Sequence, residues 1–159
     1  MRRASPLVVP LALGLVLAMS ASAAASRSLD GVVVKVVDGD TIYVRLGDRI
    51  EKIRYIGVNT PELHHPTRGE EPGGREARDA NRRLVAGRHV RVELDVQSRD
   101  RYGRLLAYVW IGSVMVNAEL VRQGYAQTMT VPPNVRHQGL FLKLEREARE
   151  AGRGLWRRA

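Results

Sequence analysis

The chain has 159 residues, a formal net charge of +9 at pH 7 and no cysteine. Its length suits one domain, and the lack of cysteine excludes disulfides, a thiolate metal site and lipid attachment at a signal-peptide cysteine. The positive charge favours a polyanionic partner such as nucleic acid, although a basic, solvated surface without such a partner gives the same charge.

Residues 1–25 are predicted to be a signal peptide. A basic start, Met1-Arg2-Arg3, precedes the apolar run Leu7–Met19 and a series of small residues that ends at Ala25. The alternative is an uncleaved membrane anchor, but the run is shorter than the ~20 residues of a membrane span and contains Pro10. We therefore expect an exported protein, secreted or periplasmic, without stable membrane association after cleavage and with its folded domain in residues 26–159.

Short β-branched runs predict three paired strands at the start of that domain. The first is Val32–Val37, and the turn residues Asp38-Gly39-Asp40 follow it. The second, Thr41–Leu46, alternates apolar and polar residues, and Gly47-Asp48 marks the next turn. The third is Glu51–Gly57. Strands joined by such tight turns form an antiparallel meander.

The second half of the chain mixes helices with two more strands. A surface loop rich in glycine and proline, Leu63–Gly74, precedes a helix over Arg75–Ala86. Strands are predicted at His89–Asp95 and Arg104–Ile111, with a polar turn over Gln97–Gly103 between them.

Two further helices are expected towards the C-terminus. Asn117 is a candidate N-cap for a short helix that runs through Gln123. The last helix is predicted roughly over Val135–Ala151, with an apolar stripe of Leu140, Leu144, Ala148 and Ala151. Five strands and three helices in this order predict a mainly β, α+β fold: a five-stranded oligonucleotide-binding barrel with three helices.

Polar residues at the strand ends are candidates for chemistry. Asp40 and the segment Asn59-Thr60 offer hard oxygen ligands for a divalent cation, provided that the strands bring the two turns together. Alternatively, the aspartates only cap a turn. Arg54 alternates with Ile53 and Tyr55 in a half-buried strand, so it needs an anion or a carboxylate partner. Taken alone, Arg104 would be interpreted as a surface arginine at the start of a strand.

Taken together, these residues resemble the staphylococcal nuclease family. The similar segments are Asp38–Thr41, Arg54, Thr60–Glu62, Arg101–Tyr108 and Val116–Gly124. Each segment is weak alone, but their order and spacing are specific, and the resemblance covers about Val32 to Trp156.

The resemblance implies a barrel that carries a Ca²⁺-dependent phosphodiesterase. It would hydrolyse DNA and RNA without sequence specificity and leave 3′-phosphate ends. By position, the catalytic residues would be Arg54, Glu62 and Arg104, and the two arginines would also bind the substrate phosphate. The calcium ligands would be Asp40, Asn59 and the backbone carbonyl of Thr60. We expect the protein to act as a monomer.

Two departures from the family pattern affect these expectations. Asn59 stands where the family's best-studied pattern has an aspartate, so one negative charge is missing and weaker metal affinity is expected. The segment Thr128–Asn134 lacks the tyrosines that the family can use to stack on a base, and we expect the nucleotide to be held differently.

Two alternatives to an enzyme stay open. One is a non-catalytic, nucleic-acid-binding barrel, and the other is a surface module that binds acidic polymers of the cell envelope. The joint presence of Arg54, Glu62 and Arg104 favours the enzyme.

Overall fold

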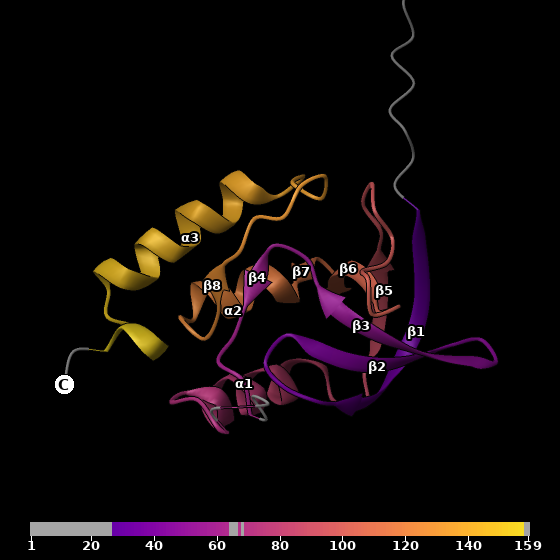
Figure 1. The fold of residues 1–159 in the computed structure, drawn as a ribbon, viewed down its shortest axis with the longest axis horizontal. Coiled ribbons are helices and arrows are strands. Elements are labelled where there is room, and N and C mark those ends of the chain that lie inside the picture. The colour runs from indigo at the N-terminus through magenta and orange to yellow at the C-terminus, as the bar shows by residue number, and fades with distance from the viewer. Residues whose placement is uncertain (1–26, 64–66, 68, 158–159) are drawn as a thin grey trace, which may run out of the picture.

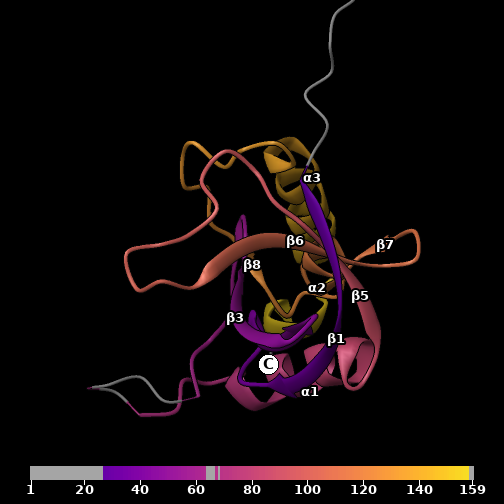
Figure 2. The same cartoon turned by 90° about the vertical axis from the view of Figure 1, so that its right-hand side faces the viewer.

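The computed structural model describes residues 27–63, 67 and 69–157, so the predicted signal peptide, residues 1–25, lies outside the described residues. Five strands form a barrel: β1 (Ser28–Val36), β2 (Thr41–Leu46), β3 (Arg49–Tyr55), β5 (His89–Glu93) and β6 (Leu105–Ile111). They pair in the antiparallel order β3-β2-β1-β5-β6, and a parallel pairing of β3 with β6 closes the barrel. Figure 1 shows the β1–β3 meander and Figure 2 shows the strands around the barrel.

The predicted fold class, a five-stranded barrel with three helices, is confirmed. The helices are α1 (Gly74–Val85), α2 (Val116–Arg122) and α3 (Gln138–Glu150), and a short 3-10 turn, η1, covers Gly154–Trp156. In Figures 1 and 2, α1 lies along the lower end of the barrel, while α2 packs between α1 and α3.

Three very short strands were not predicted from the sequence. The strand β4 (Val58–Asn59) pairs with β8 (Gln127–Thr128) as a separate two-stranded sheet, and β7 (Val114–Met115) folds back on β6. Two residues are too few for a detectable alternation of apolar and polar side chains. The pair β4–β8 matters for the site, because it fixes the chain just before Thr60 and next to Met129.

Two helix predictions need correction. Asn117 does not cap α2, since the N-cap position is Met115 and the Asn117 side chain is buried. Its Oδ1 accepts a hydrogen bond from Val109 N–H (2.9 Å) and its Nδ2 donates to the carbonyl of Ile56 (3.0 Å). Asn117 therefore ties the helix to two barrel segments, which no local pattern could indicate.

The apolar stripe of α3 is also rotated from the predicted one. Leu140 is 41% exposed, whereas Phe141 is 1% exposed and packs in the core with Ala148. Ala151 lies beyond the helix and is exposed, although Leu144 packs against the core as expected. Both Leu140 and Phe141 are apolar, so the sequence allowed either face, and packing on the barrel selects Phe141.

Among the described residues, no helix has the length and apolar character needed to cross a membrane.

Candidate active site

The turn between β1 and β2 holds a buried carboxylate. Asp40 is 2% exposed, and its Oδ1 accepts a hydrogen bond from the Thr41 hydroxyl (3.0 Å). Its backbone N–H donates to Asp38 Oδ1 (3.1 Å). Burial, and then the charge of Asp40, raise the pKa of Asp38 to about 6. A Cβ added to Gly39 would lie 2.7 Å from the Thr60 side chain, so this turn packs closely on the segment that follows β4.

Asp40 and Thr60 are joined directly. Asp40 Oδ2 accepts hydrogen bonds from the backbone N–H (2.8 Å) and the hydroxyl (3.1 Å) of Thr60, which is itself buried. The structure thus brings together the two turns that the sequence suggested as sources of oxygen ligands. The antiparallel register of β2 and β3, which places Thr41 opposite Arg54, produces this proximity.

Arg54 is a buried arginine with its guanidinium held on several sides. Its Nη2 lies 3.1 Å from Asp40 Oδ2 and donates to Asn59 Oδ1 (2.9 Å). Its Nη1 donates to the carbonyls of Tyr55 (2.9 Å) and Val58 (2.8 Å). These contacts fix the plane of the guanidinium and explain how a strand arginine that is only 8% exposed is tolerated.

The side chain of Asn59 faces Arg54 in this arrangement. Its oxygen accepts one hydrogen bond from the guanidinium, but it carries no charge to balance it. Asp40 is therefore the carboxylate that pairs with Arg54 among the described residues. A site with one carboxylate and one amide in these positions attracts a cation less strongly than a site with two carboxylates.

Glu62 has an exposed side chain on a fixed backbone. Its N–H donates to Glu71 Oε2 (3.0 Å), and Glu71 N–H donates to the carbonyl of Glu62 (2.8 Å). A Cβ added to Gly74 would come within 3.0 Å of that carbonyl, so α1 begins in close contact with this segment. Within the described part of the chain, no hydrogen bond or ion pair links the Glu62 side chain to Arg54, Arg104 or Asp40.

Arg104 is held by the turn before β6. Its Nε donates to Asp100 Oδ2 (2.7 Å) and its backbone N–H donates to Asp100 Oδ1 (3.0 Å). Burial alone would raise the pKa of Asp100, but the hydrogen bonds from Arg104 and Tyr102 outweigh it and the pKa lies below its ordinary value. Gly103, with φ 78°, allows the tight turn. The Tyr102 ring lies 5.5 Å from the guanidinium of Arg104 and is 67% exposed.

Arg54 and Arg104 share one cleft of about 490 Å³, which we call the arginine cleft. The parallel pairing of β3 and β6 brings the two arginines to the same side of the barrel, since it aligns Ile53 with Leu105 and Arg54 with Leu106. Apolar side chains complete the lining, including Met129 and Val131 from the segment that lacks the family's tyrosines. The full lining is Arg54–Gly57, Gln97, Asp100–Tyr102, Arg104, Leu106, Met129, Val131 and Asn134.

Oxygen donors gather around Asp40, yet they form no dense acidic cluster. No group of three or more His, Cys, Asp or Glu side chains in the described part of the chain could hold a metal ion. The oxygen ligands predicted for a cation are the Asp40 carboxylate, the Asn59 amide oxygen and the Thr60 carbonyl. In this structure Asn59 Oδ1 accepts a hydrogen bond from Arg54, and both Asp40 oxygens accept hydrogen bonds from Thr41 or Thr60. The predicted ligands are hard oxygens, which suit Ca²⁺ or Mg²⁺ better than softer metals, and such sites complete their coordination with water and substrate oxygens.

Sequence reasoning missed a buried link between the Asp38–Asp40 turn and α1. The Tyr55 hydroxyl donates to Asn81 Oδ1 (2.8 Å), and Asn81 Nδ2 donates to the carbonyl of Asp38 (2.9 Å). Tyr55 is 1% exposed and Asn81 is fully buried. The available signal was a polar Asn81 beside Ala77, Ala80 and Leu84 on the apolar face of a helix.

Fold and site together define a class of protein: an oligonucleotide-binding barrel whose cleft is lined by two arginines, the residue best suited to binding phosphate, beside a buried carboxylate. A sequence model described as "Staphylococcal nuclease homologue" matches residues 52–158. The chain therefore belongs to the staphylococcal nuclease family, as its motifs indicated.

Individual relatives agree with this assignment. A protein named "Thermonuclease" from Staphylococcus hyicus is 39% identical over 124 residues, which are 78% of this chain and 73% of that protein. A second "Thermonuclease", from Staphylococcus intermedius, is 36% identical over 127 residues, 80% of this chain and 76% of that protein. The "SPbeta prophage-derived endonuclease YokF" of Bacillus subtilis (strain 168) is 35% identical over 130 residues, 80% of this chain but 44% of that protein.

Proposed function

We propose that this protein is a metal-dependent nuclease that hydrolyses phosphodiester bonds of DNA and RNA. The observation that carries the proposal is the pair of arginines on β3 and before β6, which face one cleft while Asp40 contacts one of them. Membership of the staphylococcal nuclease family, and similarity to proteins named thermonuclease and endonuclease, support an enzyme. In line with the family resemblance, we propose that the activity has no sequence specificity, since contacts to phosphate carry no sequence information.

Calcium is the proposed metal, and Asp40, Asn59 and the Thr60 carbonyl would hold it. When bound, the cation would neutralise phosphate charge and polarise the P–O bonds. The buried Asp40 supplies the one full negative charge in this set, and its hydrogen bonds to Thr41 and Thr60 fix its position. The choice of calcium follows from the family resemblance and from the preference of Ca²⁺ for mixed carboxylate, amide and carbonyl oxygens.

The two arginines would bind phosphate in different ways. Arg54 donates its Nη hydrogens to the protein, so it offers a rigid, pre-oriented charge through its Nε side. In the hydrogen bonds described, Arg104 donates only its Nε and its backbone N–H, so both Nη groups can form a fork on phosphate oxygens. This pair would stabilise the charge that develops on the equatorial oxygens as the phosphorus becomes five-coordinate.

Glu62 is the proposed base or orienting group for the attacking water. Its exposed carboxylate can accept the proton, while Glu71 holds its backbone in place. The water oxygen forms a bond to phosphorus, and the bond from phosphorus to the 5′ oxygen breaks. The leaving oxygen takes a proton to become a 5′-hydroxyl, and the other product ends in a 3′-phosphate, in line with the family resemblance.

A non-catalytic nucleic-acid-binding barrel is the second candidate function. The arginine cleft and the basic charge would serve it equally well. The fixed backbone of Glu62 and the buried Asp40 favour the enzyme, because neither carboxylate would help an anion to bind.

We further propose export by the predicted signal peptide, to a secreted or periplasmic location, and a monomeric state. The support for export is the pattern of basic, apolar and small residues in positions 1–25. Amino-terminal sequencing of the exported protein would test cleavage near Ala23 or Ala25, and light scattering of the purified protein would test the monomer.

End-group analysis of the products tests the proposed chemistry. Single-stranded DNA and RNA oligonucleotides of matched sequence are digested in Ca²⁺, and the fragments are analysed by mass. Fragments from both substrates with 3′-phosphate and 5′-hydroxyl ends are expected. Cleavage of only one nucleic acid, or fragments with 5′-phosphates, would contradict the proposal in that respect.

A further inference from the structure

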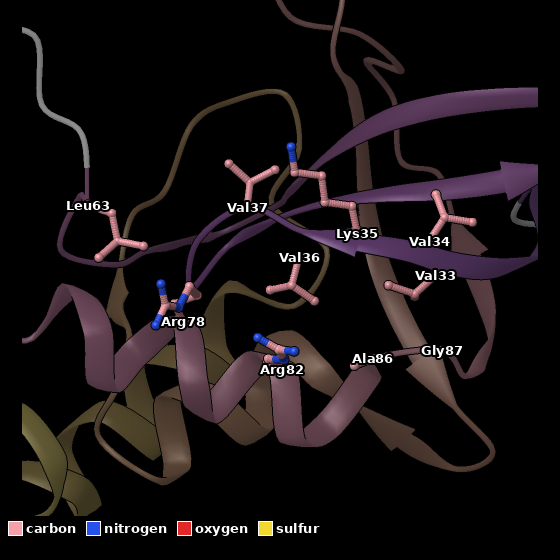
Figure 3. Close-up of a pocket in the computed structure, with 10 residues that line it drawn as sticks. All are labelled: Val33, Val34, Lys35, Val36, Val37, Leu63, Arg78, Arg82, Ala86 and Gly87. Carbon is pink, nitrogen blue, oxygen red and sulfur yellow. The ribbon is translucent and has the colours of Figure 1, made fainter.

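A second hollow shares no lining residue with the arginine cleft. It is formed between β1 and the first helix, encloses about 370 Å³ and is shown in Figure 3. We call it the β1–α1 groove. Its lining includes the apolar residues Val33, Val36 and Leu63, and its charged lining residues are Lys35, Arg78 and Arg82. None of the described residues that line it is acidic.

The arginines of α1 point into this groove. In Figure 3, Arg78 and Arg82 extend from one face of the helix towards β1, and Val36 points from the strand towards them. Arg82 is exposed, and within the described residues it forms no ion pair. Arg78 contacts Asp79 Oδ1 at 2.9 Å, but both side chains are partly exposed and such a pair contributes little. Lys35 is exposed, but in Figure 3 its ammonium points away from α1, and it lies 5.8 Å from the centre of the Tyr43 ring, so the charge that faces the groove comes from the two arginines.

Two residues that line the groove are direct sequence neighbours of acidic residues in or beside the candidate active site. Val37, which lines the groove, directly precedes Asp38, and Leu63, which also lines it, directly follows Glu62. Asp40 contacts Arg54, which lines the arginine cleft. The acidic turn is thus linked to both hollows, by chain connectivity to the groove and by the Asp40–Arg54 ion pair to the arginine cleft.

We propose that the β1–α1 groove is a second phosphate-binding site, which holds the backbone of the nucleic-acid strand beyond the bond that is cleaved. This inference rests on the proposed function. A strand whose phosphate lies in the arginine cleft is longer than that cleft, and the groove offers a positive, acid-free lining that begins one residue from Asp38 and one residue from Glu62. Apolar walls beneath guanidinium groups suit a sugar-phosphate backbone, whose sugars pack while its phosphates pair with the arginines.

Salt dependence of binding gives the sharpest test. A labelled single-stranded oligonucleotide of about 15 nucleotides is long enough to cover both hollows of a small barrel. Its binding is measured by fluorescence anisotropy in chelator, over a range of salt concentrations, for the wild type, Arg82→Gln and Arg78→Gln/Arg82→Gln. Each lost phosphate contact should reduce the steepness of log K against log salt by about 0.7. The double variant should therefore lose about 1.4 and bind several-fold more weakly at low salt.

Arg83→Gln is the matched control. It removes the same charge from the neighbouring residue of the same helix, which is also exposed but does not line the groove. We expect its salt dependence to equal that of the wild type. Competition by a dinucleotide, which is too short to reach both hollows, should be the same for all variants. Equal effects of Arg82→Gln and Arg83→Gln, or unchanged salt dependence in the double variant, would overturn the proposal.

Cleavage is measured separately, so the two proposals fail in different ways. If the wild type binds the oligonucleotide but never cuts it, the nuclease proposal fails while the anisotropy result still decides the role of the groove. If the wild type cuts the oligonucleotide and the groove variants cut and bind it as the wild type does, the groove proposal alone fails. Thermal melting of each variant checks that the exposed substitutions leave the fold intact.

Discussion

Asp100 holds Arg104 with both of its carboxylate oxygens, one on the side-chain Nε at 2.7 Å and the other on the backbone N–H at 3.0 Å. The same carboxylate accepts a hydrogen bond from the N–H of Tyr102, so it organises the whole turn before β6. This contact directs the guanidinium of Arg104 into the cleft that Arg54 also lines.

Asp100→Asn should impair cleavage because it disturbs the position of Arg104, and not because it unfolds the protein. The amide keeps one acceptor oxygen but loses the charge that fixes Nε, so the guanidinium of Arg104 should adopt several orientations. We therefore expect kcat/KM for an oligonucleotide to fall about tenfold to a hundredfold. Glu51→Gln is the matched control. Glu51 accepts hydrogen bonds from Arg99 at 2.8 and 2.9 Å, and neither residue lines the cleft. Equal losses in both variants would contradict a positioning role for Asp100.

The two arginines should differ in what their loss does to stability. Arg54→Met removes the buried ion pair with Asp40 and three hydrogen bonds, so the free energy of unfolding should fall by about 3 kcal/mol or more. Arg104→Met should change it by less than about 1 kcal/mol, because the pair with Asp100 is partly exposed. Urea unfolding measures both, and similar losses would show that the buried contacts of Arg54 do not stabilise the fold more than the pair of Arg104 with Asp100 does.

Arg104→Lys should retain stability and lose activity. A lysine keeps the positive charge but cannot form two parallel hydrogen bonds to phosphate, so we expect a loss of about 10²–10³ in kcat. The comparison of kcat with KM is informative, since a group that acts mainly in the transition state affects kcat. A variant with the wild-type kcat would remove Arg104 from the proposed mechanism.

Asn59→Asp should lower the calcium concentration that cleavage requires. The substitution restores a second carboxylate beside Asp40 and adds a charge for Ca²⁺, and we expect about a tenfold decrease in the half-saturating concentration. The added aspartate also faces Arg54, and its ion pair with Arg54 offsets part of the increase in calcium affinity. An unchanged or higher calcium requirement would show that residue 59 does not contribute to the metal site.

Asp38 should make the metal-free protein less stable as pH rises through its pKa. Its folded pKa is raised to about 6 from 3.8, so between these values the folded state binds more protons than the unfolded state. Stability from this residue is therefore highest below about pH 4 and decreases until about pH 6, by at most about 3 kcal/mol. Asp38→Asn, measured in chelator, should be more stable than the wild type at pH 7 and equal to it near pH 4. A constant difference across this range would contradict the assignment.

The barrel strands were predictable because each carries its own local pattern. The predicted β2, Thr41–Leu46, is the observed one, and β5 buries Val90 and Val92 on one face as its alternation indicated. The start of β1 was missed, because Ser28, Leu29 and Asp30 form a strand only by pairing with β5. Tertiary pairing, rather than local propensity, determined that boundary.

The site was predictable as a set of residues but not as a set of contacts. The family motifs pointed to Asp40, Arg54 and Thr60, and their proximity follows from strand register. The hydrogen bond of Asn59 to Arg54, and the buried Tyr55–Asn81 link, depend on side-chain orientations that no spacing rule supplies. The roles of Arg54, Glu62 and Arg104 in catalysis, and of Asp40, Asn59 and Thr60 in metal binding, stay predictions.

The most direct test of the central claim is the initial rate of cleavage of labelled single-stranded DNA, measured with Ca²⁺ and with chelator, for the wild type and Glu62→Gln. We predict cleavage that requires Ca²⁺ and that falls by at least about a hundredfold in the variant, because the amide cannot accept a proton from water. Intact DNA at every calcium concentration, together with tight binding of the oligonucleotide, would contradict the nuclease and leave a binding barrel.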